Sequence, residues 1–332
     1  MSKASEVAAR ASPASALGHL PVGLFAAVMA LAGLGIAWQR AAVVFGTAAW
    51  LGEAIITLAA CVFVVIAAFY WRKLLRHPKA VGAELSHPVT LPLFSMPTIG
   101  LILLGSGILP YAPAIAEPVW YAGAVGTLVL MLGIVGGWLA MRPDIRMANP
   151  SWFVPVICNA LTPVAGMPLG HDIVAWVAFA AASAIGAVVF VLVCYRLLVH
   201  ERLPMPLLPT LVILMAPTAL EFSGYVALNG GAIDAVASLL YYATLVMVGI
   251  VVLLIPLLAD VPFGPSWWSF TFPLDAAAIV ALQYDDAVGG LVPHLVAAGL
   301  LAAATAIIAL VGLRTVVACA RGTFLTPHGT LR

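Results

Sequence analysis

The chain has 332 residues, of which 64% are hydrophobic and 8% are charged, and its mean hydropathy is +1.14. A soluble globular protein has about 25% charged residues, because its surface is in contact with water. The composition therefore excludes a soluble fold and predicts a chain that is covered by lipid. The formal net charge of +1 gives no indication of a nucleic-acid partner.

Apolar runs follow one another along almost the whole chain. A transmembrane helix requires about 20 mostly apolar residues, and ten runs meet that condition. They are residues 20–38, 48–71, 92–111, 118–141, 151–169, 172–195, 204–228, 234–258, 266–284 and 290–314. Short linkers predict antiparallel neighbours in one all-α membrane domain, residues 20–314, between tails 1–19 and 315–332. The first tail has no apolar core of the signal-peptide kind.

Lysine and arginine are distributed unequally between the alternate linkers. One set of linkers and the two tails contain thirteen of them: Lys3, Arg10, Arg72, Lys73, Arg76, Lys79, Arg142, Arg146, Arg196, Arg202, Arg314, Arg321 and Arg332. The other set contains only Arg40, together with several acids. Positive residues accumulate on the cytoplasmic side of membrane proteins. Both tails are therefore predicted to be cytoplasmic, with the chain in an inner membrane.

Proline is concentrated in the odd-numbered runs. The prolines in or just before those runs are Pro21, Pro92, Pro97, Pro155, Pro163, Pro168, Pro204, Pro206, Pro209, Pro217, Pro265 and Pro273. Proline kinks a helix, and a membrane tolerates the freed carbonyls where they meet protein or a water-filled cavity. The pattern predicts five helical hairpins, each with a kinked inner helix and a smooth outer helix, around a central pore. Kinks that only improve helix packing are the alternative.

Motifs for catalysis, nucleotide binding or metal binding are not found. The sequence has no nucleophile elbow, phosphate-binding glycine loop or HExxH motif, and its four cysteines have no CxxC or Cys/His spacing. We therefore expect no enzyme activity, catalytic residue, cofactor or metal.

Two acids fall inside odd-numbered runs. Glu221 follows Pro217 in the seventh run, and Asp275 follows Pro273 in the ninth. A carboxylate within the membrane is costly unless it is paired, solvated or protonated, so it is a candidate functional residue. Either the two acids couple transport to protons or select ions, or they are neutral and hold the nearby kinks.

The ninth run begins with an aromatic string, Trp267–Pro273. The two tryptophans fit a membrane interface. Phe270 and Phe272 lie deeper, next to the kink expected at Pro273. A phenylalanine that faces a pore forms a hydrophobic constriction, whereas the alternative is an ordinary core residue.

Several stretches, in this order and spacing, resemble the tellurite-resistance/dicarboxylate transporter family, which includes the slow-type anion channels of plant guard cells. They are Pro21–Phe25 and Leu31–Trp38; Ala83–Val89; Pro150–Val156 with Asn159; Ala216–Pro217 with Tyr225 and Asn229–Gly231; and Trp267–Pro273. Pro273 follows the plant-like pattern, because the bacterial tellurite-resistance branch has glycine there.

The resemblance implies ten helices in five hairpins and a homotrimer in which each protomer has its own pore for chloride or nitrate. It implies that Phe272 closes the pore and that Phe25 is a second pore phenylalanine. Together with the acids, prolines and phenylalanine singled out above, this gives the pore-lining candidates Phe25, Pro217, Glu221, Phe270, Pro273 and Asp275. Because ionised acids facing the pore would repel anions, the alternative is a proton-coupled carrier or exporter of dicarboxylate or weak-acid anions, linked to tellurite resistance.

Overall fold

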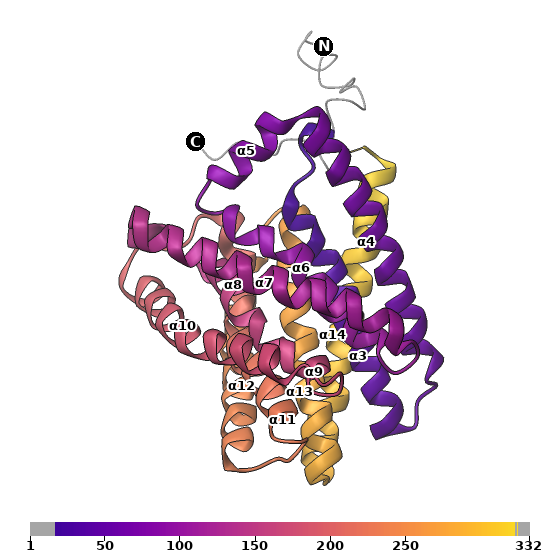
Figure 1. The fold of residues 1–332 in the computed structure, drawn as a ribbon. Helices are drawn as coiled ribbons and strands as arrows, with labels where there is room; N and C mark the ends of the chain where they lie inside the picture. Colours follow the sequence, from indigo (N-terminus) through magenta and orange to yellow (C-terminus); the bar gives the residue numbers. More distant parts are fainter. Residues whose placement is uncertain (1–16, 323, 325–332) are drawn as a thin grey trace.

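The computed structural model describes residues 17–322 and Phe324, and this part of the chain forms helices joined by turns, with no strand (Figure 1). Eight of its helical segments are long and apolar enough to cross a membrane. The protein is therefore a multi-pass membrane protein. The predicted tails lie mostly outside the described residues. Helix α14 continues to Ala320, beyond the predicted end at residue 314, because residues 315–320 are apolar or small.

The helices follow in chain order, with α for α-helices and η for 3₁₀ helices. They are η2 (Val22–Phe25), α3 (Ala26–Phe45), α4 (Trp50–Arg76), α5 (Pro78–Ser86), η3 (Leu91–Ser95), α6 (Met96–Ile108), α7 (Pro113–Met141), η4 (Ile145–Met147), η5 (Pro150–Trp152), α8 (Phe153–Ile157), η6 (Cys158–Leu161), α9 (Thr162–Gly166), α10 (Asp172–Val199), η7 (Met205–Met215), α11 (Ala216–Leu228), α12 (Ala235–Leu254), η8 (Ile255–Leu258), η9 (Pro265–Phe270), α13 (Thr271–Val288) and α14 (Leu291–Ala320).

The predicted fifth and ninth spans differ from the other eight. Residues 150–166 are divided among four short helices, η5, α8, η6 and α9. Helix α13 has three aspartates, Asp275, Asp285 and Asp286, and the η9 turn before it includes proline, serine and two tryptophans. Neither segment is among the eight that qualify by length and composition in the described part of the chain. The count of ten therefore stays a prediction.

Consecutive segments pack against each other in pairs: α3 with α4, α6 with α7, α8 to α9 with α10, α11 with α12, and α13 with α14. In the three first members that qualify as spans, 56% to 72% of the most apolar stretch is buried, against 17% to 28% in the five second members. We call each first member, together with the 3₁₀ helix that precedes it, an inner segment, and we call the second members outer helices. Figure 1 shows α4 and α14 along one side of the bundle.

Each inner segment begins as a 3₁₀ helix and changes to an α-helix partway along. Prolines mark this change: Pro97, Pro163 and Pro217 are each the second residue of an α-helix, and Pro273 is the third residue of α13. Proline is tolerated in the first turn of a helix, because its missing N–H has no partner to lose there. The prolines therefore mark where the regular helix begins in four of the five segments, whereas the first segment changes to α-helix at Ala26 without a proline.

Glycines allow α6 and α7 to cross at close range. A Cβ atom on Gly123 would lie 2.6 Å from the backbone nitrogen of Ile102 and 2.7 Å from the carbonyl oxygen of Thr98. A Cβ atom on Gly105 would lie 2.6 Å from Cβ of Trp120. The neighbouring atoms include rigid backbone, so only glycine fits this inner–outer contact.

Helix α5 lies in a linker between two apolar runs of the sequence, and it crosses one end of the bundle (Figure 1). The fully buried Lys73 of α4 holds it, because its Nζ donates to Glu84 Oε1 at 2.6 Å and to the carbonyl oxygen of Leu20 at 2.8 Å. The hydroxyl of Tyr70 donates to the other oxygen of Glu84 at 2.7 Å. The motif Ala83–Val89 thus includes a structural anchor between α4, α5 and the start of the first inner segment.

Candidate transport path

Three cavities lie among the inner segments, and each is lined by residues from all five of them. The N-terminal cavity, of about 160 Å³, is lined by early residues of the segments: Pro21, Gly23, Leu93, Ser151, Pro206, Leu207, Thr210, Ile213, Pro265, Ser266 and Ser269, with Val89. The C-terminal cavity, of about 40 Å³, is lined by later residues: Ile36, Arg40, Leu103, Ser106, Leu161, Val164, Leu220, Ser223, Phe272, Ala276, Ile279 and Gln283. All five segments therefore run in the same direction along these cavities.

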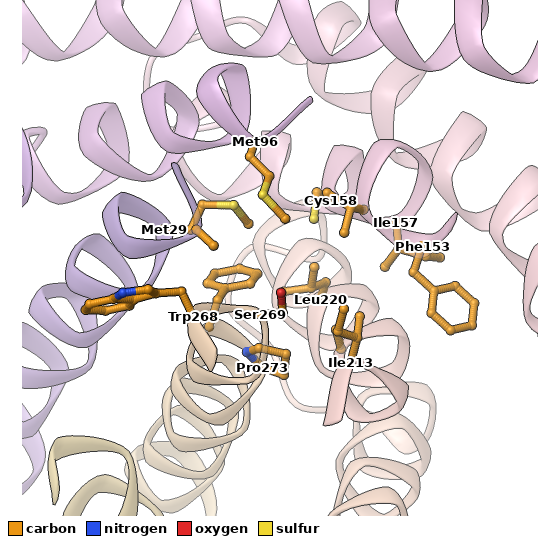
Figure 2. A pocket seen from close by; sticks show the side chains of 14 residues that line it. Met29, Met96, Phe153, Ile157, Cys158, Ile213, Leu220, Trp268, Ser269 and Pro273 are labelled. Atoms are coloured by element: carbon orange, nitrogen blue, oxygen red, sulfur yellow. The ribbon is translucent and has the colours of Figure 1, made fainter. Parts of the chain in front are cut away.

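The middle cavity, of about 20 Å³, lies where the 3₁₀ turns change to α-helix. It is lined by Ala26, Met29, Met96, Phe153, Val154, Ile157, Cys158, Ile213, Ala216, Leu220, Trp268, Ser269, Phe272 and Pro273. Figure 2 shows Met29 and Met96 above this space, with Leu220 and Pro273 on the other side. Its lining is almost entirely apolar, and its volume accommodates about one water molecule.

The cavities share walls, which fixes their order. Ile213 and Ser269 line both the N-terminal and the middle cavity. Leu220 and Phe272 line both the middle and the C-terminal cavity. Phe272 is only 6% exposed. The three spaces therefore form one axial path that narrows at its centre, with Leu220 and Phe272 between its middle and C-terminal parts.

The two ends of this path differ in chemistry. The N-terminal cavity has the hydroxyls of Ser151, Thr210, Ser266 and Ser269 and no charged side chain in its lining. The C-terminal cavity has Arg40 and the polar side chains of Ser106, Ser223 and Gln283. Ser223 and Gln283 also interact, because Ser223 Oγ donates to Gln283 Oε1 at 3.4 Å. Polar groups thus flank an apolar centre on both sides.

The sequence-predicted phenylalanines and prolines lie at different places relative to the path. Phe272 and Pro273 line it. Phe25, Phe270 and Pro217 are absent from the linings of the three cavities. The ring of Phe25 packs against rings of the outer helix α4, those of Phe63 at 5.6 Å and Tyr70 at 6.2 Å. Phe270 contacts Trp267, with 5.4 Å between ring centroids, and Pro217 is buried in the first turn of α11.

The two intramembrane acids also lie outside the three linings. Glu221 Oε2 accepts a hydrogen bond from Ser183 Oγ of the outer helix α10 at 2.8 Å. Asp275 is fully buried against α3, where a Cβ atom on Gly33 would lie 3.0 Å from its carboxyl group. Both Asp275 oxygens and Glu221 Oε1 lack a hydrogen-bond partner within the described residues. Both acids thus lie between helices, and Glu221 faces an outer helix.

Several residues of the path were not found by sequence reasoning. Met29, Met96 and Leu220 resemble dozens of other apolar residues, and only the packing of the five segments brings them together. Arg40 had a signal, because it is the single Lys or Arg in its set of linkers. The distribution of lysine and arginine indicates orientation, and it does not by itself place Arg40 beside a cavity.

An axial path inside a bundle of apolar helices defines a membrane transport protein of the channel or carrier class. The chain belongs to the voltage-dependent anion channel family, whose sequence model matches residues 19–316. It is similar to the S-type anion channel SLAH3 of Arabidopsis thaliana, at 24% identity over 87% of this chain and 46% of the relative. It is also similar to the guard cell S-type anion channel SLAC1 of the same plant, at 27% identity over 82% of this chain and 51% of the relative.

A bacterial relative matches over more of its own length. The tellurite resistance protein TehA homolog of Haemophilus influenzae is 24% identical over 80% of this chain and 81% of the relative. The chain therefore spans about half the length of the plant relatives and most of the bacterial one. The family resemblance recognised in the sequence is confirmed by these matches.

Proposed function

We propose that the protein is a passive channel for small monovalent anions such as chloride and nitrate, closed by Phe272. One observation supports this most directly: Phe272 lines both the middle and the C-terminal cavity, at the narrow part of the path. Related chains are described as anion channels. An apolar ring across a narrow path blocks ions both sterically and by excluding water.

The helix dipoles favour anions at the N-terminal cavity. The five inner segments run in parallel, so their N-terminal ends, which have partial positive charge, surround that cavity. The hydroxyls of Ser266 and Ser269 add hydrogen-bond donors without a fixed charge, whereas those of Ser151 and Thr210 already donate to Asn149 Oδ1 and to the carbonyl oxygen of Leu207. Such a distributed field attracts anions weakly and favours those that lose water easily.

The proposal includes the membrane arrangement. We propose ten transmembrane helices in five hairpins around the path in each protomer of a homotrimer, in the inner membrane. The N-terminal cavity would face the cytoplasm, since Arg72, Arg76 and Arg142 lie at the ends of α4 and α7 on that side. Both tails would then also be cytoplasmic.

Replacement of the Phe272 ring tests the closure. Phe272→Ala removes the shared wall of two cavities, so anion conductance of reconstituted protein should rise by about tenfold or more. Planar-bilayer currents under asymmetric salt measure the conductance, and the reversal potential gives the sign and rank of the permeant ions. Phe270→Ala is the matched control, because Phe270 lies two residues earlier and outside the cavity linings. Unchanged conductance in folded Phe272→Ala would refute the proposal.

A proton-coupled carrier or exporter of dicarboxylate or weak-acid anions is the second candidate, favoured by the buried unpartnered oxygens of Glu221 and Asp275. The channel proposal expects Glu221→Gln and Asp275→Asn to keep the pH dependence of anion flux, because neither residue lines the path. Flux into proteoliposomes, measured over a range of pH, decides between them. Loss of the pH dependence in either variant would favour the carrier.

A further inference from the structure

We infer that Arg40 is the selectivity residue that admits anions at the C-terminal mouth of the path. This inference rests on the proposed anion transport. Arg40 lies on α3 within two turns of its C-terminal end, is exposed, and lines the C-terminal cavity with Ser106 and Gln283. It is the only charged side chain in that lining.

The charge of Arg40 is not neutralised by an ion pair. Within residues 17–322 the ion pairs are Lys73 with Glu84, His171 with Glu117, and His294 with Asp285. Within the described residues, no carboxylate pairs with Arg40 and no hydrogen bond holds its guanidinium. A guanidinium without an ion-pair partner therefore borders the space through which an anion would pass.

The opposite polarity of the helix ends makes this cation necessary. The five parallel inner segments direct their C-terminal ends, which have partial negative charge, toward the C-terminal cavity. Asp285 and Asp286 at the end of α13 add negative charge on the same side. Without Arg40 this mouth would repel anions, whereas the N-terminal mouth attracts them through the helix ends alone.

Arg40 is also isolated from every other lysine and arginine. The other lysines and arginines of the described residues lie near the C-terminal ends of the outer helices and in the linkers after them, on the side of the N-terminal cavity. Arg40 is therefore the one lysine or arginine of the described residues at this end of the path, where it opposes the negative charge of the helix C-termini and of the acids. Ser106 Oγ already donates to the carbonyl oxygen of Ile102, and Ser223 Oγ to Gln283 Oε1. Among the polar side chains of this lining, the amide nitrogen of Gln283 is therefore the neutral donor that an anion would meet beside Arg40.

The experiment uses the Phe272→Ala background, in which the proposed channel is open and its current is measurable. Adding Arg40→Gln should lower chloride conductance in 0.1 M salt by about threefold to tenfold and shift the reversal potential toward weaker anion selectivity. The loss should shrink in 1 M salt, because exposed charges are screened there. Adding Arg40→Lys should restore most of the conductance, since it restores the charge.

Two control variants separate a local effect from a general change of surface charge. Arg76→Gln makes the same substitution at the other end of the bundle, on an exposed residue outside the linings. Glu117→Gln removes a charge at the same end of the bundle as Arg40. Glu117 lies near the start of α7 and outside the lining of the C-terminal cavity. Both should leave conductance and selectivity close to those of Phe272→Ala alone.

Three results would overturn the inference. The first is unchanged conductance and selectivity on adding Arg40→Gln to a conducting Phe272→Ala channel. The second is a loss that persists in 1 M salt and in Arg40→Lys, because that pattern belongs to a structural role. The third is absence of anion current in Phe272→Ala itself, which refutes the proposed function before Arg40 is changed and removes the basis of the inference.

Discussion

The fourth pair of helices illustrates a difference that runs through the whole molecule. Its inner segment, Met205–Leu228, has a hydropathy of 1.7, and 72% of its most apolar 18-residue stretch is buried. Its outer helix, Ala235–Leu258, has a hydropathy of 2.4, and 17% of the corresponding stretch is buried. The first two pairs show the same order, 1.8 against 2.5 and 1.7 against 2.0. The more buried helix is thus the less apolar one, opposite to the rule for a soluble protein.

Lipid explains this inversion. The outer helices contact hydrocarbon, which excludes polar groups and irregular backbone. The inner segments contact protein and the axial cavities, which tolerate prolines, 3₁₀ turns and hydroxyls. Prolines and 3₁₀ turns in the sequence therefore indicate which helices are internal. The division into inner segments and outer helices can be tested by three changes, given from the largest expected effect to the smallest.

Gly123→Val should prevent stable packing of the inner segment α6 on the outer helix α7. A side chain there meets backbone atoms of α6 that cannot move aside, so the destabilisation should be roughly 3 kcal/mol or more. Thermal unfolding and folded yield in detergent measure it. Gly133→Val in the same helix is the control, because a Cβ at Gly133 meets no atom within 4 Å. Equal stability of the two variants would show that close helix approach is not required.

Leu220→Ala and Leu253→Ala make the same change on an inner and an outer helix. Leu220 is 1% exposed and lines two cavities, whereas Leu253 is 79% exposed. Shortening Leu220 widens the wall that it shares with Phe272, so anion conductance should rise by about twofold to tenfold. Leu253→Ala should leave the current unchanged. The result would contradict the division if the outer variant altered conductance as much as the inner one.

Asp234 connects an inner segment to its outer helix. Its Oδ1 accepts from the backbone N–H groups of Val236 and Ala237 at the start of α12, and its Oδ2 accepts from Tyr225 of α11. The N–H of Ala237, followed by the Tyr225 hydroxyl, lowers the pKa of Asp234 below its usual 3.8. Because the pKa is lower in the folded state, the ionised carboxylate stabilises the fold at pH values above 3.8. This stabilisation is lost as the pH falls from 3.8 through the lower pKa of the folded state.

Asp234→Ala should therefore lower the melting temperature slightly near neutral pH, because the variant loses the N-terminal cap of α12. The difference from the unmodified protein should shrink as the pH falls below about 3.8. Thermal unfolding at several pH values measures it. A difference that is constant with pH would mean that the charge of Asp234 does not contribute.

The site was predictable from the sequence only in part. The string Trp267–Pro273 indicated Phe272 through family resemblance, and both Phe272 and Pro273 line the path. The resemblance also proposed Phe25, and the position of acids inside apolar runs proposed Glu221 and Asp275. The side chains of these three residues pack against α4, α10 and α3. Depth along a helix can be read from sequence, but the direction of a side chain cannot when all faces are similarly apolar.

The amino-acid sequence by itself determined the membrane class, the alternation of irregular and smooth helices, and the family, because each depends on composition or on local patterns such as Pro97 and Pro217. Only the tertiary structure decided which side chains border the path and that Lys73 anchors α5. The path is formed by five segments that are far apart in the chain. Their relative rotation and depth depend on contacts such as Gly123 with α6, which no single segment encodes.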